Sequence, residues 1–256
     1  MLLTLDYLVK KYNLKINGVS HFGAHLGEEV SSYKALNIKN IHLFEPQSKI
    51  FNSLKKDFLD DKDVFLYNFG LGEQNISMQM FIPENYEMSA SLLEPKHHKT
   101  LYPDISFQGS EEVEIRIYDE LKIEDVNFLN IDIQGYELLA LKGSQEALRN
   151  KIDYIFIEVA MIDLYKNNAL VGELDEFLEE FNFIRVETKW VNRFVLWGDA
   201  LYIKKHNLNA LRVYKGKTIK FLENFSMYFL FIDFLRLFKR IKNKTKQFIK
   251  TILGII

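Results

Sequence analysis

Two glycines and one acid have the spacing of a binding site for a ribonucleoside cofactor. Gly23 and Gly27 enclose three residues between a predicted strand at 18–22 and a predicted helix at 28–36. Glycine permits a sharp turn and a close approach of the backbone to a ligand. Glu45 ends the next predicted strand, 22 residues after Gly23, where a carboxylate can accept hydrogen bonds from both ribose hydroxyls. The pattern does not choose between a dinucleotide and S-adenosylmethionine, and the alternative is a glycine pair that only packs and an acid that is only solvated.

Two further acids are placed to move a proton or to hold a cation. Asp132 and Glu158 lie at the ends of apolar segments, 127–132 and 154–159, that we expect to be neighbouring strands. A hydroxyl nucleophile needs a general base, or a cation that lowers its pKa, and a carboxylate serves either purpose. We predict Asp132 as base or metal ligand and Glu158 as second candidate, with a divalent cation such as Mg²⁺ as the metal. The alternative is that Asp132 caps the helix after Gly135 and that Glu158 pairs with a lysine.

These residues must be positioned by alternating strands and helices. We predict strands at 18–22, 40–45, 64–69, 127–132 and 154–159, and helices at 28–36, after Pro46, at 136–143 and at 144–149. Such alternation indicates a parallel sheet covered on both faces, with ligands at the carboxyl ends of its strands. The segments 183–190 and 200–204 are separated only by a loop and are predicted to form an antiparallel hairpin. The stretch 83–110 has weak periodicity and is predicted to be a long functional excursion.

The motifs in combination resemble one family. They read Val19-Ser20-His21-Phe22-Gly23-Ala24-His25-Leu26-Gly27, Phe44-Glu45-Pro46, Ser89-Ala90-Ser91-Leu92-Leu93, Asp132-Ile133-Gln134-Gly135-Tyr136-Glu137 and Trp197-Gly198-Asp199-Ala200-Leu201-Tyr202. They are similar to motifs of the FkbM family of S-adenosylmethionine-dependent methyltransferases, across roughly residues 16–204. The resemblance implies an α/β, Rossmann-like class I methyltransferase fold, with a mostly parallel seven-stranded sheet that contains one antiparallel strand. It also implies methyl transfer from S-adenosylmethionine, usually to a hydroxyl oxygen.

The resemblance also places the cofactor contacts. The matching positions are His21, Gly23, Ala24, Gly27, Glu45, Pro46 and Asp132. The chain departs from the family pattern twice, with His21 where Asp is common and Gln134 where Glu is frequent. A neutral imidazole can hydrogen-bond the amino-acid part of the cofactor, but it lacks the charge with which a carboxylate attracts an ammonium group.

The long excursion supplies candidates for the acceptor site. We predict that it closes over the acceptor and that Ser89, Ser91 and His98 contact it. Surface histidines next to lysines are also commonly just solvated, which is the alternative for His98. Glu137 begins the helix after the glycine turn and is predicted to reach back to backbone N–H groups or to contact the acceptor.

The last part of the chain differs in charge from the rest. Residues 211–256 carry 11 Lys and Arg against 2 Asp and Glu, a net charge of +9, which leaves −11 for residues 1–210. Aromatic and leucine residues beside lysines and arginines indicate a C-terminal helical tail that lies on an anionic membrane surface. The alternative is a helix docked on the body or on a second subunit of a homo-oligomer, and no nucleic-acid partner is expected because no RNA-binding fold accompanies the charge.

The chain therefore divides into an N-terminal helix at 1–15, a methyltransferase domain at 16–210 and a basic amphipathic tail at 211–256. Without cysteine or a recognisable signal peptide, it is expected to be cytoplasmic, at the inner face of the membrane if the tail binds lipid. The predicted function is O-methylation of a hydroxyl on a sugar, a polysaccharide or a glycolipid intermediate. An NAD-dependent oxidoreductase acting on nucleotide sugars is one alternative, although no third glycine follows Gly27. A scaffold that keeps the fold without turnover is the other.

Overall fold

The computed structural model describes residues 2–84, 89–97, 102, 104–191, 197–209, 212 and 216. The chain divides into two compact units, Met1–Asn209 and Ala210–Ile256. The predicted basic tail lies outside the described residues, apart from positions 212 and 216, so its helix stays a prediction. In the part of the chain that is described, no helix is both long enough and apolar enough to cross a membrane.

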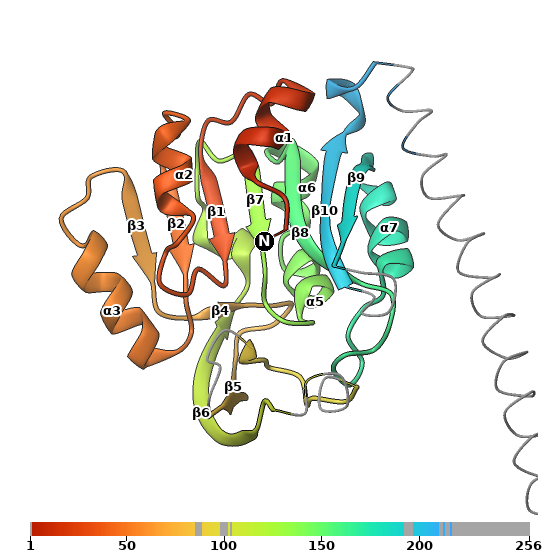
Figure 1. Cartoon of the computed structure of the whole chain (residues 1–256). Coiled ribbons are helices and arrows are strands. Elements are labelled where there is room, and N and C mark those ends of the chain that lie inside the picture. Colours follow the sequence, from red (N-terminus) through yellow and green to blue (C-terminus); the bar gives the residue numbers. More distant parts are fainter. Residues whose placement is uncertain are drawn as a thin grey trace, which may run out of the picture. The chain divides into compact units, whose positions relative to one another are not determined.

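The first unit is built on one seven-stranded sheet (Figure 1). Its strands are β1 Val19–Phe22, β2 Ile41–Phe44, β3 Val64–Tyr67, β7 Phe128–Ile131, β8 Tyr154–Ala160, β9 Phe183–Trp190 and β10 Trp197–Lys204. They follow the order β3-β2-β1-β7-β8-β10-β9. The first five pair in parallel, whereas β10 runs antiparallel to both of its neighbours. The predicted fold, a mostly parallel seven-stranded sheet with one antiparallel strand, is confirmed.

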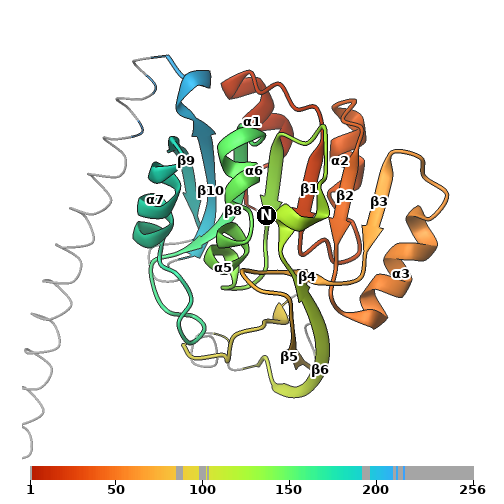
Figure 2. The same ribbon diagram turned by 180° about the vertical axis from the view of Figure 1, so that it is seen from behind.

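The central strands are apolar on both faces because helices cover both faces. Side chains alternate along a strand, so Phe128 packs on one side of β7 while Leu129 and Ile131 pack on the other. The helices are α1 Leu5–Tyr12, α2 Val30–Ala35 and α3 Ser48–Phe58 on the first side, and α5 Glu137–Lys142, α6 Gln145–Asn150 and α7 Val171–Glu180 on the second. Figures 1 and 2 show these layers from opposite directions.

A second, three-stranded sheet was not predicted from the sequence. It consists of β4 Gly70–Leu71, β5 Ile76–Pro83 and β6 Phe107–Arg116 in the order β4-β6-β5. β5 and β6 pair antiparallel, so the predicted excursion at 83–110 begins and ends within paired strands. The interpretation of weak periodicity was wrong at these margins, because β6 is largely exposed and buries only Val113 and Ile115 in the core of this sheet. Figures 1 and 2 place this sheet beyond the carboxyl ends of β1 and β2.

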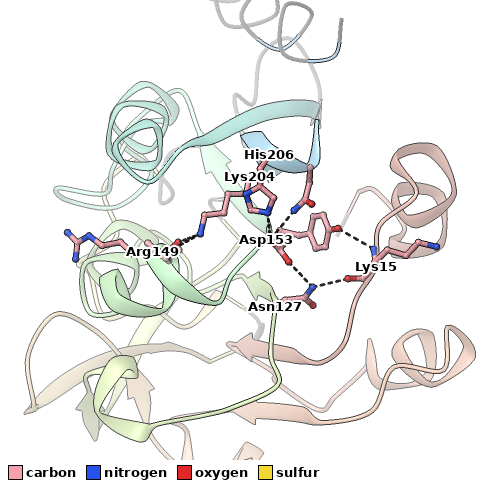
Figure 3. A network of polar contacts seen from close by, with 9 residues as sticks. Lys15, Asn127, Arg149, Asp153, Lys204 and His206 are labelled. Carbon is pink, nitrogen blue, oxygen red and sulfur yellow. Dashed lines mark hydrogen bonds and ion pairs between the residues drawn. The ribbon is translucent and has the colours of Figure 1, made fainter. Parts of the chain in front are cut away.

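A polar network holds the opposite edge of the large sheet (Figure 3). Asn127 donates from Nδ2 to Asp153 Oδ2 at 3.1 Å and to the Lys15 carbonyl oxygen at 2.8 Å. The Lys204 ammonium donates at 2.7 Å to each of two carbonyl oxygens at the end of α6, Leu148 and Arg149. A cation at a helix C-terminus satisfies carbonyls that lack helical partners. The network thus fixes the start of β7, the start of β8 and the end of β10, and leaves the other edge of the sheet for a site.

Candidate active site

A cavity of about 310 Å³ opens at the carboxyl edge of the large sheet. The turn after β1, the end of β2 and the end of β7 form most of its wall, and the second sheet closes it from the other side. The lining residues include His21 of β1 and, from the turns after β1, β2 and β7, Gly23, Ala24, Glu45, Pro46, Asp132 and Gln134. Met80 of β5, and Ala90 and Leu92 of the segment that follows β5, line it from the other side. Six of the seven predicted cofactor contacts therefore line one cavity, as expected for an open α/β sheet.

The two glycines of the first turn, Gly23 and Gly27, are required for different structural reasons. Gly23 has a φ of +81°, and a Cβ there would stand 2.1 Å from the Asp132 carbonyl oxygen. Only glycine therefore allows β1 to turn against the end of β7. Gly27 has a φ of +78° and lies against α3, since a Cβ would stand 2.6 Å from the Phe58 ring. Gly27 packs the turn onto α3 and is not among the residues that line the cavity.

Glu45 is held ready to accept hydrogen bonds. Its carboxylate accepts from the backbone N–H of His25 at 3.0 Å and from that of Gln47 at 2.8 Å. The side chain is only 3% exposed, and burial raises its pKa to about 7. Each carboxylate oxygen keeps a lone pair beyond the backbone bonds, so the residue fits the ribose hydroxyls for which it was predicted.

His21 lines the same cavity as a neutral ring. The Tyr33 hydroxyl lies 3.2 Å from His21 Nδ1, and Asn130 donates from Nδ2 to that hydroxyl at 2.6 Å. Burial lowers the pKa of His21 to about 4, so the imidazole carries no charge at neutral pH.

Gln134 joins the two predicted catalytic acids. Its side-chain amide donates to Asp132 Oδ1 at 2.9 Å and to Glu158 Oε2 at 3.2 Å. Its own oxygen accepts from the Tyr165 hydroxyl at 2.8 Å. Burial raises the pKa of Asp132, and burial together with the charge of Asp132 holds the pKa of Glu158 well above its usual range. The pair is therefore more basic than exposed carboxylates, as a proton acceptor requires.

Only one of the two acids faces the cofactor cavity. Asp132 follows β7 directly and lines that cavity, whereas Glu158 lies inside β8 and lines a separate, much smaller space beside Tyr165. The two strands are parallel neighbours, as predicted. The alternative in which Asp132 caps the next helix does not hold, because α5 begins after Tyr136 with no side-chain cap.

The arrangement does not fit the predicted divalent cation. A cation site needs several oxygen ligands around one point, yet a hydrogen-bond donor, the Gln134 amide, stands between the two carboxylates. Within the described residues no three His, Cys, Asp or Glu side chains are grouped so that they could hold a metal ion.

Two of the residues predicted to contact the acceptor, Ser89 and Ser91, are buried and do not line the cofactor cavity, and their contact with the acceptor stays a prediction. Ser91 is fully buried, donates from Oγ to the Gln134 carbonyl oxygen at 2.6 Å and accepts from the Leu93 N–H at 3.0 Å. Ser89 is also buried, and Ala90 and Leu92, which alternate with the serines, are the residues of this segment that line the cavity. Because side chains alternate along an extended segment, Ala90 and Leu92 face the cavity and the two serines face away from it.

Glu137 takes the first of its two predicted positions. Its Oε1 accepts from the backbone N–H groups of Gly135 at 2.9 Å and Ile133 at 3.3 Å, so it reaches back to the turn. It lies outside the lining of the main cavity. His98 lies outside the described residues, and its predicted contact with the acceptor stays a prediction.

The chain matches one family of known proteins. The family model described as the methyltransferase FkbM domain matches residues 21–185. The chain belongs to the FkbM methyltransferase family. The sequence-based prediction of a methyltransferase is confirmed at the level of the family, and the NAD-dependent oxidoreductase is set aside.

Two individual relatives illustrate how distant the members of the FkbM family are. The 2-O-methyltransferase NoeI of Sinorhizobium fredii is 23% identical over 174 residues, which are 63% of this chain and 71% of that protein. The crystal structure of an FkbM methyltransferase from Methylobacillus flagellatus is 16% identical and superposes with a TM-score of 0.50. That match covers 73% of this chain but only 43% of the other, so this chain spans less than half of the solved protein. At this identity the likeness shows the shared fold alone.

Several residues of this FkbM site were missed from the sequence. Asn130 lies on β7 two residues before Asp132, which directly follows that strand, so strand alternation could have placed both on one face. Tyr33 and Tyr165 carry no such signal. They reach the site from α2 and from the loop after β8, and no local pattern links them to it.

Proposed function

We propose that this FkbM-family chain transfers a methyl group from S-adenosylmethionine to a hydroxyl of a sugar, a polysaccharide or a glycolipid intermediate. The observation that carries the proposal is the half-buried acid pair, Asp132 and Glu158, bridged by Gln134 at the wall of the cofactor cavity. A relative named as a 2-O-methyltransferase supports the choice of oxygen as acceptor. The sugar acceptor rests on the resemblance and on the basic tail.

The residues of the cavity fit the proposed cofactor. Glu45 would accept from the ribose hydroxyls, and Gly23 would let the cofactor approach the backbone between β1 and β7. When bound, S-adenosylmethionine supplies a methyl group that is already activated by its sulfonium. The chain therefore has to align the acceptor and take its proton.

Asp132 is the proposed general base. It would take the hydroxyl proton of the acceptor, whose oxygen would receive the activated methyl group while the electrons of the carbon–sulfur bond stay on sulfur. Burial raises the pKa of this acid, and the Gln134 amide fixes one of its oxygens at 2.9 Å. Glu158 is kept at the far side of the same amide, where burial and the charge of Asp132 raise its own pKa.

Replacement of the base tests the proposal. Asp132→Asn should lower methyl transfer from labelled S-adenosylmethionine to a panel of sugar acceptors by about 100-fold or more. Asp60→Asn, at an exposed position after α3, is the matched control and should leave turnover unchanged. Full turnover by Asp132→Asn would refute the role of Asp132. Calorimetric titration of the wild-type chain should show binding of S-adenosylmethionine and none of NAD, and binding without transfer to any acceptor would favour the non-catalytic scaffold.

We further propose that residues 211–256 bring the enzyme to an anionic membrane surface, such as the inner face of the cell membrane. Their net charge of +9 against −11 for the rest of the chain supports this, because each basic residue near an anionic surface adds about 1 kcal/mol of attraction. The full chain should float with vesicles that contain phosphatidylserine and remain behind with purely zwitterionic ones. A chain that ends at residue 209 should not float. If the full chain does not float and instead elutes as a dimer that the shortened chain loses, the tail binds a second subunit.

A further inference from the structure

Three buried side chains form a hydrogen-bonded chain that ends at the cofactor cavity. Asn130 of β7 donates to the Tyr33 hydroxyl of α2, which lies 3.2 Å from Nδ1 of His21 on β1. All three residues are at most 2% exposed. Buried polar groups of this kind have defined donor and acceptor roles because none can exchange partners with water.

The direction of the chain determines which ring nitrogen of His21 carries the proton. The Tyr33 hydroxyl accepts a hydrogen bond from Asn130 Nδ2 and donates one to His21 Nδ1, so Nδ1 is the acceptor and Nε2 carries hydrogen. With the Asn130 amide reversed, its NH₂ group would be buried without a partner. As it stands, the Asn130 oxygen is the atom without a partner among the described residues, and buried carbonyl oxygens tolerate this better than buried N–H groups.

The protonated nitrogen is the one left for a ligand. His21 Nε2 has no hydrogen-bond partner among the residues that the structure describes, and His21 lines the cavity. In the sheet register His21 lies between Leu43 of β2 and Asn130 of β7. It therefore stands between the acid proposed for the ribose, at the end of β2, and the acid proposed as base, at the end of β7.

Glu29 offers the complementary charge at the same cavity. It immediately precedes α2 and makes no side-chain cap. Within the described part of the chain its carboxylate accepts only from its own backbone N–H. It lines both the cofactor cavity and a second cavity of about 190 Å³ that Tyr33 and Asn130 also line. A neutral donor and a carboxylate thus line one cavity, at the strand end where family members commonly have one carboxylate.

We propose that His21 and Glu29 together bind the amino-acid end of S-adenosylmethionine, with His21 Nε2–H donating to its carboxylate and Glu29 accepting from its ammonium. The inference rests on the proposed function, since it assigns partners to that cofactor. A donor without charge selects an acceptor such as a carboxylate, and it could not attract an ammonium group. Tyr33 and Asn130 are positioning residues that fix the tautomer of His21.

The tautomer can be measured without cofactor. Nitrogen-15 NMR of the full chain labelled at histidine should show His21 protonated on Nε2 near neutral pH, with a chemical-shift pattern of one tautomer. Tyr33→Phe removes the donor to Nδ1 but keeps the ring, and should give a mixture of tautomers. A wild-type His21 that is protonated on Nδ1 would overturn the proposal.

The ligand contacts can be separated by pairing protein variants with cofactor analogues in calorimetric titrations. Removal of the carboxylate, in decarboxylated S-adenosylmethionine, should weaken wild-type binding about tenfold or more and should cost little further in His21→Phe. Glu29→Gln should weaken S-adenosylmethionine by a similar factor but remain sensitive to loss of the carboxylate. Glu112→Gln, on the exposed strand β6, is the matched control and should change nothing.

The outcomes distinguish this inference from the proposed function. Wild-type affinity that is equal for the cofactor and its decarboxylated analogue would refute the role of His21 while the methyltransferase stands. Equal affinity of Glu29→Gln and the wild type would refute the role of Glu29. No binding of S-adenosylmethionine to the wild type would refute the proposed function, and with it both contacts.

Discussion

Glu137→Gln should make the protein more stable at alkaline pH and change its stability little at acidic pH. Glu137 is 4% exposed, and its Oε1 accepts from the backbone N–H groups of Ile133 and Gly135. A glutamine oxygen can accept the same two bonds. The substitution therefore removes a buried charge and keeps both hydrogen bonds to the turn that carries Gln134.

The magnitude follows from the pKa of this carboxyl. Burial raises the pKa of Glu137 from 4.5 to about 7, and each pKa unit corresponds to about 1.4 kcal/mol. Between these values the folded chain binds more protons than the unfolded chain, so this residue's contribution to the free energy of unfolding falls as pH rises. The cost is complete above pH 7 and amounts to about 3 kcal/mol, which Glu137→Gln would remove.

Urea unfolding of the full chain at pH 5 and pH 8 is the assay. The gain in the free energy of unfolding should approach about 3 kcal/mol at pH 8 and stay below about 1 kcal/mol at pH 5. Glu112→Gln, at an exposed position of β6, should show no difference between the two pH values. If Glu137→Gln shifts stability equally at both pH values, or destabilises at both, burial of the charge does not control this residue.

Three further predictions follow from the site and from the residues that pack around it. Gly23→Ala places a Cβ 2.1 Å from the Asp132 carbonyl oxygen at a φ of +81°, and should lower the free energy of unfolding by about 2 kcal/mol or more in thermal unfolding. Gly172→Ala in α7, where a Cβ meets no atom within 4 Å, is the control and should cost nothing. Affinity for S-adenosylmethionine should rise as pH passes through about 7, because Glu45 then ionises and can accept from both ribose hydroxyls, and Glu45→Gln should flatten this profile in calorimetry. Arg185→Met leaves Asp175 as a buried charge that has lost two bonds of 2.9 and 3.0 Å, and should lower the urea midpoint by an amount equivalent to about 3–5 kcal/mol; a loss below about 1 kcal/mol would show that Asp175 finds another partner.

Most of the fold could be predicted from local patterns in the sequence. Strands that read as apolar runs, such as 154–159, are apolar because both faces of the sheet are covered, and their length and spacing are visible without coordinates. The second sheet was not predicted, for two reasons. A long segment separates β5 from β6, and both strands are partly solvated, so neither shows a clean alternation of apolar and polar residues by itself. Strand pairing over such a separation is not encoded in any one segment.

The functional site, like the fold, could be predicted from the sequence only in part. The sequence by itself determined that a glycine turn, an acid after β2 and an acid after β7 meet at one edge, because parallel strands bring their carboxyl ends together. It also showed that His21 and Gln134 depart from the family pattern. What each does was decided only by the tertiary structure, which brings Tyr33 from α2 beneath His21 and places the amide of Gln134 between two carboxylates. Hydrogen bonds depend on distances of a few tenths of an ångström between groups from different elements, and only packing sets those distances.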